Sequence, residues 1–247
     1  MTDESRARFA AAVRDDPVDL ALVCLLVGAE VEPGLDPAPY LAQLDELAAA
    51  VDHDRPAVEA LRAVLAGFTG DAHDYRDLRS SLLHEVLTRR AGLPILVSVV
   101  WLEVARRSGI AAHGIGLPGH FVVRVGEEYV DPFAGGAALD VTGVPEHLLQ
   151  PWQPEEILLR ILTNIRVWAA QSHERTPVRM WAVDLALLLP HHPLDLRRER
   201  GALRVARADF ARGAADLEAY ADGVAGADAA AAEQVRQQAR LARSRLN

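Results

Sequence analysis

The sequence predicts an α+β fold, in which a helical N-terminal region and a central helix pack on a small antiparallel sheet and an α-helical repeat tail follows. Three observations lead to this expectation. Apolar residues recur at helical spacing through most of residues 5–108, and a β-rich stretch with turn residues near its centre occupies residues 112–131. Helical spacing then returns at residue 154 and continues to the end. We therefore expect one domain over residues 1–153 and a second, helical region over residues 154–247.

Proline and glycine mark the ends of the helices that apolar spacing predicts in the first domain. Gly92 is expected to cap the last helix before the centre of the domain, and Pro94 suits the first turn of the next helix because its missing N–H has no partner there. That central helix should end at Gly109, and it is apolar nearly all round from Ile95 to Leu102, which indicates that it is buried. The helices expected before it cover residues 5–14, 18–30, 38–51, 56–67 and 78–91.

A β-hairpin is predicted within residues 112–131, where β-branched and aromatic side chains flank a pair of turn residues. A two-residue turn would pair Val125 with Glu128. It would also place His120 and Asp131 on one face of the sheet, as diagonal neighbours within reach of a hydrogen bond. A three-residue turn without a bulge would place these two side chains on opposite faces.

The helical tail follows a period of about 34 residues, which is typical of tetratricopeptide repeats. Residues 194–227 match that repeat through Gly201 in a first helix and through Gly213 and Leu217 in a second, whereas residues 160–193 match it loosely. The tail is therefore interpreted as tetratricopeptide-like. Its helices are expected near residues 155–171, 177–189, 195–207, 210–222 and 228–245. An exposed basic stripe is interpreted at Arg197, Arg198, Arg200 and Arg204.

Composition excludes several classes of function. The 247-residue chain has a formal net charge of −9, which argues against binding to nucleic acid or to an anionic membrane. Its single cysteine, Cys24, permits no intramolecular disulfide, and its apolar runs are too short to span a bilayer, so we expect a cytoplasmic protein. There is no glycine-rich phosphate loop and no tight metal-ligand spacing, so neither a cofactor nor a metal is expected.

The most specific pattern in the chain lies in residues 79–136. It consists of Arg-Arg-Ala-Gly-Leu-Pro at 89–94, Gly-His-Phe at 119–121 and Asp-Pro-Phe at 131–133. In this order and spacing the pattern resembles the transglutaminase-like superfamily, in particular its SirB-type branch, over roughly residues 35–165. The resemblance implies a cysteine at the N-terminus of the central helix that attacks an amide carbonyl. It also implies a histidine base on the next strand and an aspartate on the following strand that orients the histidine.

On this resemblance His120 matches the histidine and Asp131 the aspartate, but the cysteine position falls on Pro94. Proline offers neither a nucleophile nor a backbone N–H for an oxyanion hole. Ser98 lies one helical turn further on, and its hydroxyl either approaches His120 or bonds back to the carbonyl of Pro94. Cys24 lies in an apolar run and is interpreted as part of the core.

Three functions follow from this arrangement. We expect a non-catalytic transglutaminase-like protein, a pseudoenzyme, that binds a peptide or protein partner beside His120, with the tail as a docking surface. The alternative is an amide or ester hydrolase that uses Ser98 or an activated water with His120 and Asp131, and the third is a structural adaptor with an inert cleft. A Ser98 hydroxyl against a His120 nitrogen would favour the hydrolase, an apolar plug over His120 the adaptor, and an open polar groove ligand binding.

Overall fold

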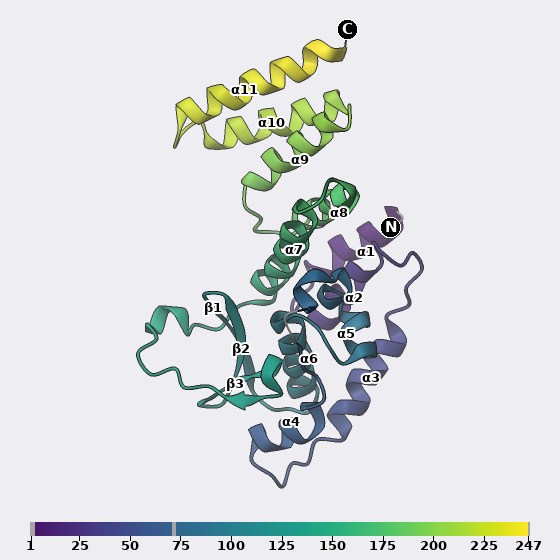
Figure 1. Ribbon diagram of the computed structural model, residues 1–247, viewed down its shortest axis with the longest axis vertical. Helices are drawn as coiled ribbons and strands as arrows, with labels where there is room; N and C mark the ends of the chain where they lie inside the picture. The colour runs from purple at the N-terminus through teal and green to yellow at the C-terminus, as the bar shows by residue number, and fades with distance from the viewer. Residues whose placement is uncertain (1–2, 71–72, 247) are drawn as a thin grey trace. The chain divides into compact units, whose positions relative to one another are not determined.

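Residues 3–70 and 73–246 are described by the computed structural model, and the chain divides into two units (Figure 1). The first unit is Met1–Trp168 and the second is Ala169–Asn247. The first combines helices with a small sheet and the second is helical, so the predicted α+β class is confirmed. The helix α7, Pro154–Ala170, begins where the helical region was expected to begin, yet most of it lies within the first unit.

The helices of the first unit lie close to the positions that apolar spacing predicts. Asp19 caps one of them, α2, by accepting a hydrogen bond from the backbone N–H of Leu22 at 2.9 Å. Among the described residues, no helix is both long enough and apolar enough to cross a membrane. The helices that precede the centre of the unit are α1 (Asp3–Ala12), α2 (Leu20–Gly28), α3 (Ala38–Ala49), α4 (Ala57–Leu65) and α5 (Leu83–Arg89).

The segment before the central helix differs from the prediction of one helix over residues 78–91. A 3-10 helix covers Leu78–Ser81, and Leu82 is extended before α5 begins. The carbonyl of Ser80 accepts a hydrogen bond from the N–H of Leu93 at 2.9 Å, which directs this carbonyl away from a continuous helix. The apolar stripe remains in place across the interruption, which is why apolar spacing alone does not reveal it.

The residue that ends α5 is also different from the one predicted. Arg90, with φ of 56°, is the left-handed C-cap, and its N–H donates to the carbonyl of Val86. Gly92 is needed for close packing instead, because a Cβ there would lie 2.4 Å from a methyl carbon of Val86. The arginine side chain lies over the ring of Phe68, 5.6 Å from its centroid, a cation–π contact that holds the residue in this position.

α6, Pro94–Arg107, is the buried central helix that the sequence predicts. Figure 1 shows it between the helices of the first unit and the sheet, and it contacts α2, α3, α4 and α5 as well as β1 and β2. It ends just before Gly109, whose φ of 74° suits glycine. Its fully enclosed side chains include Val97, Val99, Val100, Trp101 and Val104.

The sheet has four antiparallel strands in the order β1-β2-β3-β4. Val125 pairs with Glu128 across the hairpin, so the predicted two-residue turn is confirmed. The fourth strand was not predicted, because two alanines after a glycine pair carry no β signal. The strands are β1 (Ala112–Leu117), β2 (His120–Val125), β3 (Glu128–Asp131) and β4 (Ala137–Ala138).

The second unit contains the helices that the repeat pattern predicts. α9 and α10 approach closely at two glycines, since a Cβ on Gly201 would lie 3.0 Å from the carbonyl oxygen of Gly213. The predicted exposed basic stripe is wrong in part: the side chains of Arg200 and Arg204 are only 18% and 19% exposed, and both form ion pairs with the buried Asp216. The helices are α8 (Thr176–Ala186), α9 (Asp195–Ala206), α10 (Phe210–Val224) and α11 (Ala229–Arg243).

Candidate functional site

The centre of the candidate site is an imidazole–carboxylate pair at one edge of the sheet. His120 is the first residue of β2 and Asp131 the last residue of β3, so the antiparallel register brings them together. The Nε2 atom of His120 lies 3.0 Å from Oδ2 of Asp131, and the two side chains are 30% and 18% exposed. The prediction that they share a face and lie within hydrogen-bond reach is confirmed.

Asp131 is held in place by the loop that follows it. Its second carboxylate oxygen accepts a hydrogen bond from the N–H of Phe133 at 2.9 Å, and its carbonyl accepts one from the N–H of Gly136 at 2.8 Å. The guanidinium of Arg62, on α4, donates two hydrogen bonds to the carbonyl of Gly136, at 3.0 and 2.8 Å. Through Arg62, α4 therefore helps to position the Asp131 carboxylate, which in turn orients His120.

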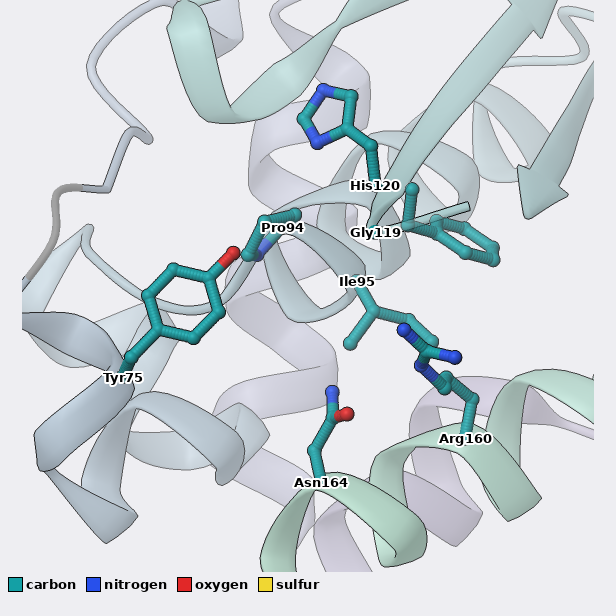
Figure 2. Close-up of a pocket in the computed structure, with 8 residues that line it drawn as sticks. Tyr75, Pro94, Ile95, Gly119, His120, Arg160 and Asn164 are labelled. Carbon is teal, nitrogen blue, oxygen red and sulfur yellow. The ribbon is translucent and has the colours of Figure 1, made fainter. Parts of the chain in front are cut away.

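The pair determines which nitrogen of His120 is open to a ligand. An ionised carboxylate can only accept, so Nε2 donates to Asp131 and the neutral ring presents Nδ1 as an acceptor. Figure 2 shows a ring nitrogen on the side of the imidazole that faces Pro94. The site therefore has a base that is oriented but unoccupied by any side chain of the described residues.

Pro94 forms the wall beside this imidazole. It is the first residue of α6 and lines the same pocket as His120. The next residue, Ile95, also lines the pocket, and its backbone N–H has no acceptor within the described chain. The head of α6 thus presents to the pocket a pyrrolidine ring and, within the described residues, one backbone amide without an acceptor.

Ser98 does not contact His120. Its side chain is fully buried, and its hydroxyl donates a hydrogen bond to the carbonyl of Phe121 at 3.4 Å rather than to the carbonyl of Pro94. This bond joins α6 to β2. Cys24 lies in the core on α2, and its pKa is raised, chiefly because burial penalises the thiolate and further because of the charges of Glu103 and Asp19.

A pocket opens between the pair and α7. Its empty space amounts to roughly 320 Å³ when the open solvent at its mouth is counted, so the pocket itself is small. Three polar side chains line it that motif reasoning had not identified: Tyr75, Arg160 and Asn164. Figure 2 shows the Tyr75 hydroxyl directed toward Pro94, and the ends of Arg160 and Asn164 reaching from α7 toward Ile95.

Local sequence gives only a weak signal for these three residues. Arg160 and Asn164 are four residues apart on α7, so they project from the same side of the helix. Tyr75 is placed by a tertiary contact, since its ring meets that of Phe133 edge-on at 6.3 Å between centroids. An asparagine within the apolar run of α7 is the one clue that pattern reasoning had available.

The two-residue segment of Thr69 and Gly70 connects the residues before α6 to the loop after β3. The N–H of Thr69 donates to the carbonyl of Arg90 at 3.1 Å, and its own carbonyl accepts from the N–H of Gly92 at 3.2 Å. The N–H of Gly70 donates to the carbonyl of Phe133 at 3.3 Å. A Cβ at Gly70 would lie 2.4 Å from the carbonyl oxygen of Gly92, so only glycine fits here. The segment before α6 and the loop after β3 are therefore held at a fixed separation.

Metal ligands do not gather in the part of the chain that the structure describes. No group of three or more histidine, cysteine, aspartate or glutamate side chains there could hold a metal ion. The described lining of the pocket presents hydrogen-bonding groups, one guanidinium and the oriented imidazole.

Comparison with protein families assigns both parts of the chain. Residues 38–169 match the model of the transglutaminase-like superfamily, and residues 165–247 match the model of the tetratricopeptide repeat. The first match contains every residue of the pocket described above. The two matches meet within α7, which agrees with the division into two units.

Individual relatives give the same assignment. A UPF0162 protein of Xylella fastidiosa is 31% identical, over 77% of this chain and 79% of its own length. A UPF0162 protein of Pseudomonas aeruginosa is 33% identical, over 61% of this chain and 65% of its own length. The F-box only protein 21 of Mus musculus is 36% identical over a shorter stretch, which covers 30% of this chain and 14% of that protein.

Proposed function

This chain belongs to the transglutaminase-like superfamily, among the SirB-type UPF0162 proteins, and we propose that it is a non-catalytic member that binds a peptide or protein partner. The observation that carries the proposal is the composition of the pocket. It holds an oriented imidazole and several polar groups, and the motif resemblance assigns the nucleophile position to Pro94. A site of this kind can hold a peptide group without forming an acyl-enzyme.

The second unit supports the same proposal. Tetratricopeptide repeats generally form extended surfaces for protein–protein contact, and this unit has the close helix packing of such a repeat at Gly201 and Gly213. A chain that joins a small pocket to a repeat surface is suited to a macromolecular partner with one group that enters the pocket. The three functions considered from the sequence make different demands on the surroundings of His120.

The adaptor hypothesis requires an apolar plug over His120, whereas the ring is 30% exposed and lines an open pocket. The serine route to hydrolysis requires a hydroxyl at the imidazole, whereas the Ser98 hydroxyl is buried and bonded to the carbonyl of Phe121. Hydrolysis by a water held at Nδ1 of His120 is the second candidate, because that nitrogen is oriented and open. Hydrolysis by such a water would proceed without a covalent intermediate.

A peptide-binding experiment with a mass measurement tests both candidates. The purified full chain is titrated into N-terminally fluorescein-labelled random octapeptides, anisotropy reports binding, and mass spectrometry reports any cleavage. We expect saturable binding of uncleaved peptides, weakened about tenfold or more by His120→Ala, in line with a lost hydrogen bond in a desolvated site. The matched control is His113→Ala, which removes an exposed histidine of β1 outside the pocket and should leave affinity unchanged.

Two results would overturn the proposal. Cleavage that disappears in His120→Ala would make the protein a hydrolase. The absence of saturable binding to any peptide of the library would remove the peptide partner. Circular dichroism of both variants ensures that the comparison is made between folded proteins.

A further inference from the structure

The charge of the pocket differs from the charge of the chain. The formal net charge of the whole protein is −9, yet the described residues that line the pocket include Arg160 and His120 and no aspartate or glutamate. Asp131 lies next to the pocket, but its carboxylate is engaged by Nε2 of His120 and by the N–H of Phe133. The described part of the lining is therefore positively charged within an acidic protein.

The groups on the α7 side of the pocket are mainly donors. Neither the Arg160 guanidinium nor the Asn164 amide has a hydrogen-bond or ion-pair partner among the residues that the structure describes. Both reach toward the head of α6 in Figure 2, where the N–H of Ile95 is also without an acceptor. A guanidinium, an amide and a backbone N–H together match the two oxygens of a carboxylate.

The opposite side of the pocket offers an acceptor. Nδ1 of His120 faces the pocket because Nε2 is bound to Asp131. A group that fills the pocket therefore needs an anion at the α7 end and an N–H at the β2 end. The last residue of a peptide has both, since its own amide N–H and its α-carboxylate are separated by a single Cα.

The size of the pocket fits one residue of this kind. Its empty space is only roughly 320 Å³ even when open solvent at the mouth is counted, so the pocket suits a single terminal residue better than a longer segment. Pro94 and Ile95 supply an apolar wall against which its side chain can pack. One permanent positive charge in the lining suits a monoanion better than a phosphate group.

We propose that this pocket binds the C-terminal carboxylate of the peptide partner, an inference that rests on the proposed function. Arg160 and Asn164 donate to the carboxylate oxygens, and Nδ1 of His120 accepts the amide N–H of the terminal residue. The preference for a chain terminus follows from this combination, because an internal glutamate or aspartate presents its carboxylate several bonds away from the nearest backbone N–H.

The test uses two versions of the same probe, the labelled random octapeptide library made as free acids and as C-terminal amides. We expect the full chain to bind the free acids about tenfold or more tightly than the amides, the range for hydrogen bonds to a charged group. Arg160→Met keeps most of the aliphatic stem and should abolish this preference. The matched control, Arg8→Met, removes an exposed arginine of α1 and should keep the preference unchanged.

Further versions of the probe distinguish the source of the carboxylate. A C-terminally amidated library with glutamate at one internal position reports binding through a side chain, and N-acetylglycine as a competitor reports binding of a small free acid. Strong binding of the internal-glutamate amides, or equal binding of acids and amides, would overturn the terminal-carboxylate proposal while leaving peptide binding intact. Failure of every version to bind would instead remove the proposed function itself. Competition by N-acetylglycine that Arg160→Met abolishes would support the assignment of the carboxylate to Arg160.

Discussion

Replacing Pro94 with cysteine is expected to create a reactive thiol at the head of α6. The position is the first residue of a 14-residue helix and lines the same pocket as His120. A thiolate there would meet the positive end of the helix dipole and an imidazole that Asp131 already orients. The substitution therefore tests whether proline occupies the place from which the superfamily's nucleophile acts.

The size of the effect follows from these two features. A helix N-terminus favours a negative charge by about 0.3–1 kcal/mol, which is roughly 0.2–0.7 pKa units. A thiol that passes its proton to Nδ1 of the neighbouring imidazole forms a thiolate–imidazolium pair, and a neighbouring opposite charge lowers the pKa of an acidic group by about 1–3 units. Together they lower the pKa of the new thiol from about 8.5 to about 5–7. At pH 6 the thiolate fraction should then rise about 30-fold or more over that of an unperturbed cysteine.

The assay is the rate of alkylation by iodoacetamide as a function of pH, with peptide mapping to locate the label. Cys24 serves as an internal control, because it is buried and its raised pKa keeps it protonated. The double variant Pro94→Cys, His120→Ala removes the imidazole and should return the thiol pKa most of the way to about 8.5. Thermal unfolding of each variant establishes that the proteins compared are folded.

The reasoning would be refuted by a thiol in Pro94→Cys that titrates at about 8 or above. It would equally be refuted by a low thiol pKa that His120→Ala leaves in place, because the imidazole would then play no part. Either result would mean that the head of α6 does not face the imidazole in the way a nucleophile must.

Three further predictions concern stability, measured by urea unfolding. Asp216→Ala should lower the free energy of unfolding by about 1.5–3 kcal/mol, because Arg200 loses its bidentate partner and keeps only its hydrogen bond to Asp184 at 3.3 Å. Gly70→Ala should destabilise by about 1–3 kcal/mol through overpacking, whereas Gly226→Ala, with open space around it, should have little effect. Burial lowers the pKa of His84 below its ordinary value of 6.5, so the unfolded chain takes up this proton first. The free energy of unfolding should therefore fall as the pH drops from about 7.5 to 5.5, and it should fall less in the His84→Leu variant. An equal fall in the original protein and in the variant would contradict the lowered pKa of His84.

The fold was largely predictable because its main features have local causes. Pro94 begins α6, Gly109 follows its end, and the turn between Val125 and Glu128 determines the register of the hairpin. The errors fall where tertiary contacts override local signals. The carbonyl of Ser80 bonds to the N–H of Leu93 and interrupts a predicted helix, and no periodicity can express such a contact.

The candidate site was predictable only in its motif residues. His120 and Asp131 were identified because resemblance and strand register both pointed to them. Arg160, Asn164 and Tyr75 come from segments far apart in the chain, and each enters the pocket through packing that no short pattern encodes. When a site is assembled from segments far apart in the chain, the sequence predicts only those of its residues that belong to a motif.

The exposure of the imidazole–carboxylate pair indicates what it contributes. A partly exposed side-chain pair of this kind adds at most about 1 kcal/mol to stability, and His120 and Asp131 are 30% and 18% exposed. The carboxylate also caps the turn at Phe133, a role in which an asparagine oxygen would serve as well. A purely structural role therefore gives no reason for a histidine at this position. Orientation of Nδ1 toward the pocket does give one, because it requires both the ring and the charge that holds the other nitrogen.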